Sequence, residues 1–312
     1  MINFNVQFTA KNLTGNAGLS HLGRFAKKLG LKQMLENQIS IERGANAKHT
    51  IADAVMMLIM GVSVGIKHMS HLKVLRLDKV IRTLFCWENF PDDRTFGRMF
   101  RLFNHNHCNE LSEVESKARK KVWSKKWFGR ATLDVDSSVK GVSGSQEGAA
   151  KGYNPDKKGQ KSYHPLFCFI AETSECLHHW FRTGSAYSAN GVVEFMKECF
   201  ERLPERVWKV FVRADSAFFY GELLDFLEKK KSEYLIKVKM RNLPSLLMQQ
   251  SWRKAKNKPG IETAEFMHKC HGWKKERRFV AIRKLVKIET EYVLFPMPQY
   301  EFFCYVTNRD LS

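Results

Sequence analysis

ATLDVDSSV, residues 131–139, is the stretch that decides how this chain folds. Apolar and β-branched residues alternate with polar ones along it, which is the pattern of a strand with one covered face. Before it, from about residue 19 to 127, apolar residues recur at spacings of three and four, which is the period of a helix. The chain therefore changes near residue 129 from a helical part to a part built on a sheet.

The order of elements after residue 129 predicts a mixed sheet. Three strands in succession favour a meander, and the strand–helix alternation that follows favours right-handed parallel crossovers. This order is that of a ribonuclease H-like fold. The expected elements are strands at 131–139, 164–172 and 176–184, a helix at 188–204, a strand at 207–218, a helix at 221–231 and a strand at 233–240.

Composition limits the partners of the chain. Lysine and arginine total 52 against 32 acidic residues, a net charge of +20, which indicates a polyanionic partner such as nucleic acid. The seven cysteines are scattered and lack a CxxC pair, so we expect reduced thiols in a cytoplasmic protein rather than disulfides or a zinc ribbon. The most apolar stretch, residues 51–64, is too short to span a membrane. No glycine-rich nucleotide motif predicts a small-molecule cofactor.

Three parts of the chain follow from these patterns. We expect a helical DNA-binding or dimerisation region at 1–128, a ribonuclease H-like core at 129–240 and a β-rich insertion at 241–312, with strands near 277–288, 290–295 and 302–308. In the first part, Thr50 is expected to cap one helix and Thr95 to open another. The helix pair near residues 91–101 fits a helix-turn-helix reader using Thr95, Arg98 and Arg101, and equally a bundle with solvated arginines.

Three aspartates carry the candidate chemistry. Asp134 and Asp136 are two apart on a strand and so share a face, and Asp215 ends the apolar strand VFVRAD just before a helix. Strand-end carboxylates that meet above a sheet are hard oxygen ligands that suit Mg²⁺. Two such ions handle phosphodiesters by activating the attacking oxygen and stabilising the leaving one. The alternative, aspartates that only cap strands or form turns, is equally open on this pattern.

The combination of LDVDSS (133–138), GYNP (152–155) with SYHP (162–165), and RADSAF (213–218) resembles the DDE transposases of bacterial insertion sequences. The resemblance implies DNA transposition, a form of DNA recombination: strand transfer at transposon ends into target double-stranded DNA, by a homo-oligomer. It also implies three acidic ligands for two Mg²⁺ ions, with Mn²⁺ as a substitute. Asp136 maps to the first ligand, with Asp134 as runner-up, and Asp215 to the second.

The third acidic ligand of that family is a glutamate on a helix after the β-rich insertion, and it is absent from this chain. We therefore expect a C-terminally truncated transposase with little or no activity alone. Glu222 and Glu228 follow Asp215 on a helix, but charged helix residues are mostly solvated. Two alternatives stay open: a non-catalytic remnant that binds element ends or full-length transposase, and another ribonuclease H-like metal-dependent nuclease.

Basic runs supply the candidate DNA contacts, because lysine and arginine neutralise phosphates. The preferred run is the glycine-containing basic loop at 151–161, within the polar stretch from residue 140 to 162 that separates the first two strands. Tyr153 and Tyr163 there can stack on an unpaired base. A solvated face is the open alternative for each run. The candidate contacts are Lys151, Tyr153, Lys157, Lys158, Lys161, Lys120, Lys121, Arg277 and Arg278.

Overall fold

The computed structural model describes residues 13–154, 157–187, 189–256, 258–288 and 298–310. The chain divides into two compact units, residues 1–126 and 127–312. Within the described ranges, none of the helices combines the length and the apolar character that crossing a membrane requires. All seven cysteines lie in described ranges, and none of them forms a disulfide there.

The first unit is helical. Its core is centred on α3, whose many buried methionine and aliphatic side chains pack against the surrounding helices. The expected cap of α3 is confirmed, because the Thr50 side chain accepts a hydrogen bond from the Asp53 backbone N–H. The elements are α1 (Leu19–Leu29), α2 (Leu31–Gln38), α3 (Ile51–Ser63), η1 (Met69–Leu72), α4 (Lys73–Leu77), α5 (Lys79–Leu84), α6 (Asp93–Phe100) and α7 (His105–Trp123).

The expected start of α6 at Thr95 is wrong by two residues. The helix begins at Asp93, and the Asp92 side chain accepts from the Thr95 N–H at 2.8 Å. A carboxylate is a better helix cap than a threonine hydroxyl and also favours the positive end of the helix dipole. Thr95 therefore lies inside the first turn.

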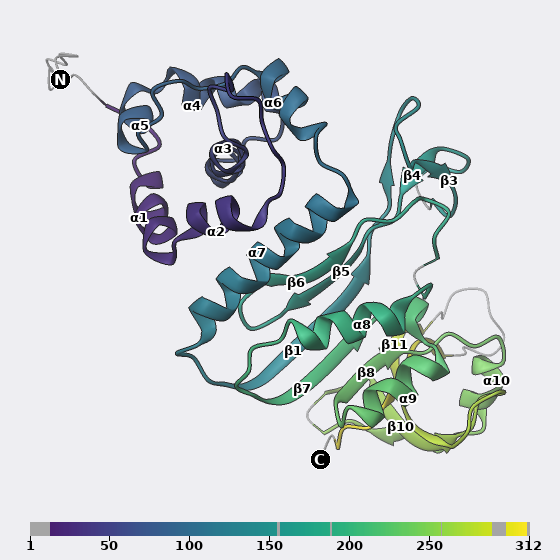
Figure 1. Cartoon of the computed structure of the whole chain (residues 1–312). Coiled ribbons are helices and arrows are strands. Elements are labelled where there is room, and N and C mark those ends of the chain that lie inside the picture. Colours follow the sequence, from purple (N-terminus) through teal and green to yellow (C-terminus); the bar gives the residue numbers. More distant parts are fainter. Residues whose placement is uncertain (1–12, 155–156, 188, 257, 289–297, 311–312) are drawn as a thin grey trace, which may run out of the picture. The chain divides into compact units, whose positions relative to one another are not determined.

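Among the described residues, the second unit is built on a nine-stranded sheet with the order β6-β5-β1-β7-β8-β12-β11-β10-β9 (Figure 1). The first five strands in that order form the core: β1, β7 and β8 run parallel, and β5 pairs antiparallel with both β1 and β6. This meander followed by two helical crossovers confirms the expected ribonuclease H-like mixed sheet. The core elements are β1 (Phe128–Ser137), β5 (Leu166–Ile170), β6 (Glu175–Trp180), α8 (Val192–Glu201), β7 (Val207–Ala214), η2 (Ser216–Phe218), α9 (Gly221–Lys229) and β8 (Glu233–Lys237).

Helices α8 and α9 lie on one face of this sheet (Figure 1). The His178 ring on β6 stacks on Phe195 of α8 with centroids 5.1 Å apart. His178 is paired with Cys168, which in turn is paired with Val135, so these buried residues all point toward the helices. Because side chains alternate along a strand, Asp134 and Asp136 point to the opposite face.

The β-rich part extends the same sheet. Strand β12 pairs antiparallel with β8, and β11, β10 and β9 follow outward. Its elements are α10 (Leu243–Met248), β9 (Arg253–Lys254), β10 (Ile261–His268), β11 (Arg277–Ile288) and β12 (Pro298–Thr307). The strand expected at 290–295 lies outside the described residues.

The stretch expected as a loop after β1 instead forms a small second sheet with the order β2-β4-β3. Its strands are β2 (Lys140–Gly141), β3 (Ala150–Lys151) and β4 (Lys161–Tyr163). Gly148 and Gly159 have φ values of 73° and 79°, which a residue with a Cβ rarely adopts. The glycines that suggested a loop are the residues that let the chain turn between these short strands.

Candidate active site

Asp136 and Asp215 lie at the ends of two neighbouring parallel strands. In the register of β1 and β7, Val135 pairs with Ala214, so Asp136 and Asp215 are the next residues on each strand. Parallel strands that end at the same level bring their C-terminal side chains to one edge of the sheet. The fold thus brings together the two aspartates that the sequence placed 79 residues apart.

The electrostatics of this edge fit two facing carboxylates. Burial raises the pKa of Asp136, and the negative charge of Asp215 raises it further. The Ser137 N–H donates to Asp136 Oδ1 at 2.8 Å and partly opposes that rise. A pair of like charges without a cation is strained electrostatically, and a divalent cation would relieve it.

Asp134 has a different partner. It is paired across the strands with Arg213, whose Nε and Nη2 donate to its two carboxylate oxygens at 2.6 and 2.7 Å. The Asp134 hydrogen bond raises the pKa of Arg213, so the guanidinium stays charged. This bidentate pair occupies both oxygens of Asp134, whereas those of Asp136 meet only one backbone N–H in the described contacts.

The turn after β7 is fixed by Asp215 itself. Its Oδ1 accepts from the Ala217 N–H at 2.9 Å and caps the short helix η2, while the Phe218 side chain is fully buried. Asp215 therefore has the capping role that the sequence left open as an alternative. The cap fixes the orientation of its carboxylate and uses only Oδ1. Capping and metal binding use different oxygens and are compatible.

His164 supports the turn after Asp136. The ring is buried: Nδ1 lies 2.6 Å from the Ala186 carbonyl oxygen and Nε2 lies 3.1 Å from Ser137 Oγ. A carbonyl oxygen only accepts, so Nδ1 carries the proton and, in the neutral ring, Ser137 donates to Nε2. This directs the Ser137 hydroxyl proton away from the neighbouring Asp136 carboxylate.

No third acidic side chain joins this pair in the part of the chain that the structure describes. In those ranges, no three histidine, cysteine, aspartate or glutamate side chains cluster as a metal site. Glu222 is exposed, and Glu228 binds Arg277, Lys275 and the Tyr234 hydroxyl. Neither glutamate contacts Asp136 or Asp215 in the part of the chain that the structure describes.

Most of the expected DNA-contacting side chains are exposed. Lys120, Lys151, Lys157, Lys158 and Lys161 all face solvent. Tyr153 is 66 % exposed. Lys121 is also exposed, and its ammonium donates to the Leu29 carbonyl oxygen at 2.8 Å at the C-terminus of α1. In the suggested reader helix, Arg98 donates to the Thr95 hydroxyl and Arg101 is exposed.

Arg277 is a correction to that set. Its side chain is 3 % exposed and its guanidinium donates to Glu228 and Asp225 while lying 4.6 Å from the centre of the Trp273 ring. A buried guanidinium with these partners cannot reach a phosphate, so its contribution is to the fold. Arg278 next to it pairs with Glu265 and donates to the Arg309 carbonyl oxygen.

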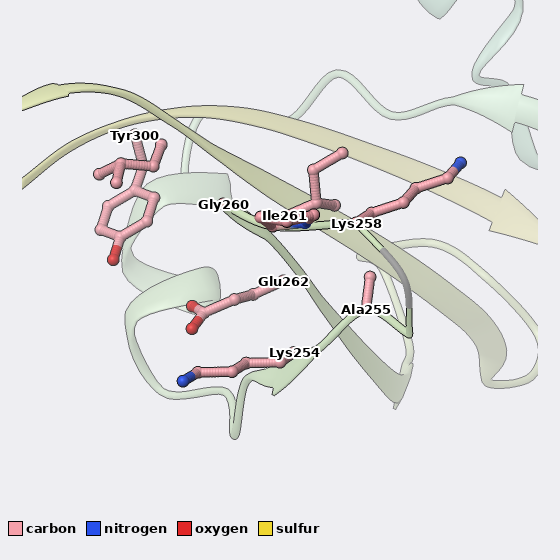
Figure 2. A pocket seen from close by; sticks show the side chains of 9 residues that line it. Lys254, Ala255, Lys258, Gly260, Ile261, Glu262 and Tyr300 are labelled. Carbon is pink, nitrogen blue, oxygen red and sulfur yellow. The ribbon is translucent and has the colours of Figure 1, made fainter.

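A cavity of about 520 Å³ lies in the β-rich part, away from the carboxylate pair (Figure 2). Lys254, Lys258 and Tyr300 line it together with Glu262 (Figure 2). Glu262 is an ion-pair partner of Arg283. Neither Asp136 nor Asp215 lines this cavity, so it is not where the candidate chemistry lies.

Sequence reasoning missed three contributors to the site: His164, Arg213 and Arg182. The motifs SYHP and RADSAF contain the first two, but their partners, Ser137 and Asp134, are 27 and 79 residues away. Arg182 donates to the carbonyl oxygens of His164, Tyr187 and Asn190, and no local pattern announces such a role.

The family model described as transposase DDE domain group 1 matches residues 2–307. A search of curated proteins finds no match. A solved structure of a piggyBac transposase synaptic complex with hairpin DNA is similar, with a TM-score of 0.43 and 14% identity over 98% of this chain. This chain spans 64% of that piggyBac chain.

Two Mos1 structures are also similar. The Mos1 transposase paired-end complex with left transposon end has a TM-score of 0.25 and 9% identity, over 77% of this chain and 72% of that one. The Mos1 mariner paired end complex with Mn has a TM-score of 0.25 and 10% identity, over 68% of this chain and 66% of that one.

Proposed function

Because this chain belongs to the transposase DDE domain group 1 family, we propose that it binds insertion-sequence DNA ends and takes part in metal-dependent DNA strand cleavage and transfer. The observation that carries the proposal is the meeting of Asp136 and Asp215 at adjacent ends of β1 and β7. Family membership favours a transposase over an unrelated nuclease of the same fold.

The donor chemistry of the site fits a divalent metal. Two carboxylates meet there, burial and then the charge of Asp215 raise the pKa of Asp136, and hard oxygen donors of this kind suit Mg²⁺ or Mn²⁺. When bound, two such ions would supply Lewis acidity to the attacking and leaving oxygens of a phosphodiester. Asp136 and Asp215 would hold them, and Arg213 keeps Asp134 out of this ligand set.

The other side chains of the site would position its ligands and its substrate. His164 and Ser137 hold the turn that carries Asp136, and the cap on η2 holds Asp215. The exposed lysines of the small sheet and its connections would neutralise phosphates of the bound DNA. We place this activity in the cytoplasm and expect a homo-oligomer that needs no small-molecule cofactor.

A second candidate is a DNA-binding protein that does not cut, favoured by the missing third acidic ligand among the described residues. We expect purified protein to bind DNA but to leave supercoiled plasmid carrying the element ends almost uncut in Mg²⁺ or Mn²⁺. Gel mobility and plasmid relaxation measured on the same samples separate the two properties. Robust sequence-specific cutting would refute the inactivity and leave the transposase assignment standing.

Charge reversal at Lys157, Lys158 and Lys161 is expected to weaken DNA binding and flatten its dependence on salt. Each lost phosphate contact lowers the log–log salt slope by about 0.9, so the triple variant loses up to about three. A titration of labelled duplex across salt concentrations measures this slope. Charge reversal at Lys197 and Lys229, on α8 and α9, is the control, and an unchanged slope in the triple variant contradicts the contact.

A further inference from the structure

The small sheet has an outer face made of three lysines and a tyrosine. Lys151 pairs directly with Lys161, and Lys140 pairs directly with Tyr163. Directly paired residues share a face, and side chains alternate along a strand, so these four point the same way. Ser162, between Lys161 and Tyr163, is fully buried and points the other way.

This face carries an uncompensated positive charge. Lys151 and Lys161 are like charges placed opposite each other, an arrangement that destabilises an antiparallel pair. Among the described residues, no ion pair neutralises either of them or Lys140. All three lysines are exposed. An anion seated on the outer face would remove that repulsion, and a row of phosphates matches a row of lysines.

Aromatic rings adjoin the same face. Phe181 is 69 % exposed, and its ring centroid lies 4.5 Å from that of Tyr163. The segment that contains Phe181 packs closely against the small sheet. An isolated β-bridge joins Tyr163 to Thr183, and a Cβ on Gly152 would lie 1.8 Å from the Gly184 carbonyl oxygen. Only glycine permits that approach, so the position of Phe181 beside Tyr163 is built into the fold.

We propose that the outer face, defined by Lys140, Lys151, Lys161, Tyr163 and Phe181, binds an unpaired DNA strand. Lysines contact its phosphates, and the two rings stack on its bases. Bases in a duplex are already stacked on each other, so exposed rings favour unpaired DNA, whereas lysines alone would serve either form. Strand β2 begins three residues after Ser137, so the chain leads from the carboxylate pair directly into the sheet that carries this face, where a frayed end would bind.

The inference rests on the proposed function, and fluorescence anisotropy in EDTA tests the two separately. The probes are a blunt duplex and the same duplex with an unpaired tail. We expect the tailed probe to bind roughly tenfold more tightly, as stacking of one base allows. Phe181→Leu should reduce its affinity nearly to that of the blunt probe and leave blunt binding unchanged.

Trp208→Leu is the matched control, because Trp208 is an exposed ring, 73 % accessible, at the opposite end of β7 from Asp215. It should keep the preference for the tailed probe. Equal affinity of the unmodified protein for both probes overturns the inference and leaves DNA binding intact. An equal loss on both probes in Phe181→Leu also overturns it. Failure to bind either probe overturns the proposed function as well.

Discussion

Replacing Arg277 with alanine is expected to lower the free energy of unfolding by about 3 kcal/mol, because it removes a buried guanidinium and leaves the partly buried Glu228 with Lys275 as its remaining cation. Arg277 links β11 to α9 through Glu228 and Asp225. Burial of the guanidinium acts to lower the pKa of Arg277, but the hydrogen bonds to these two carboxylates outweigh it, so the pKa is raised. The same contacts hold the pKa of Glu228 below its usual range. Urea unfolding followed by far-ultraviolet circular dichroism measures the loss.

Arg278→Ala is the control, since it removes a charge from the adjacent position. Its partner Glu265 is largely exposed, so the loss should stay below about 1 kcal/mol. Combining Arg277→Met with Glu228→Gln removes both buried charges and keeps an oxygen acceptor for the Tyr234 hydroxyl, so it should recover part of the stability. Equal losses for Arg277→Ala and Arg278→Ala would contradict the structural role of Arg277.

Arg277 also shows where sequence reasoning stops. The run KKERR (274–278) looks like a phosphate-binding patch, because charge is visible in a sequence and burial is not. One arginine of that run is inside the protein because α9 places two acids opposite it. A run of basic residues predicts a basic surface only when no acidic residues from distant segments pair with it.

The core strands and their order were predictable for a physical reason. β1, β5, β6, β7 and β8 alternate in hydrophobicity or form apolar runs, and the period of that pattern is set locally. The small sheet was not predictable, because β2, β3 and β4 have two or three residues each and no measurable period. Their pairing depends on contacts such as Gly152 with Gly184, which no local pattern contains.

The two strand-end aspartates were predictable as a pair, but the strand pattern alone did not separate Asp134 from Asp136, and only the family resemblance favoured Asp136. Both lie on one face at a spacing of two, so alternation treats them alike. The difference comes from a cross-strand neighbour: Arg213 lies opposite Asp134, whereas Asp215 lies two residues after Arg213, level with Asp136. Register between strands distant in sequence decides which carboxylate stays free, and we assign the metal-binding role to Asp136 on that basis.

Replacing Asp136 or Asp215 with asparagine is expected to weaken Mn²⁺ binding by more than about tenfold. Loss of a residue that only supports a metal ligand already lowers metal affinity about tenfold or more, and loss of a direct ligand should lower it further. In the unmodified protein, Mn²⁺ at ten times its dissociation constant should stabilise the fold by about 1.4 kcal/mol. Thermal unfolding with and without Mn²⁺ measures both effects. Asp134→Asn is the control and should keep the response to Mn²⁺.

Without metal, we expect Asp136→Asn to be more stable than the unmodified protein. The pKa of Asp136 is raised in the folded state, so its charged form destabilises the fold at neutral pH and its protonated form does not. Asp136→Asn should therefore unfold at a higher temperature than the unmodified protein in EDTA at neutral pH. The difference should vanish as pH falls through the Asp136 pKa. A variant that is less stable than the unmodified protein in EDTA at neutral pH would mean that Asp136 serves the fold rather than a cation.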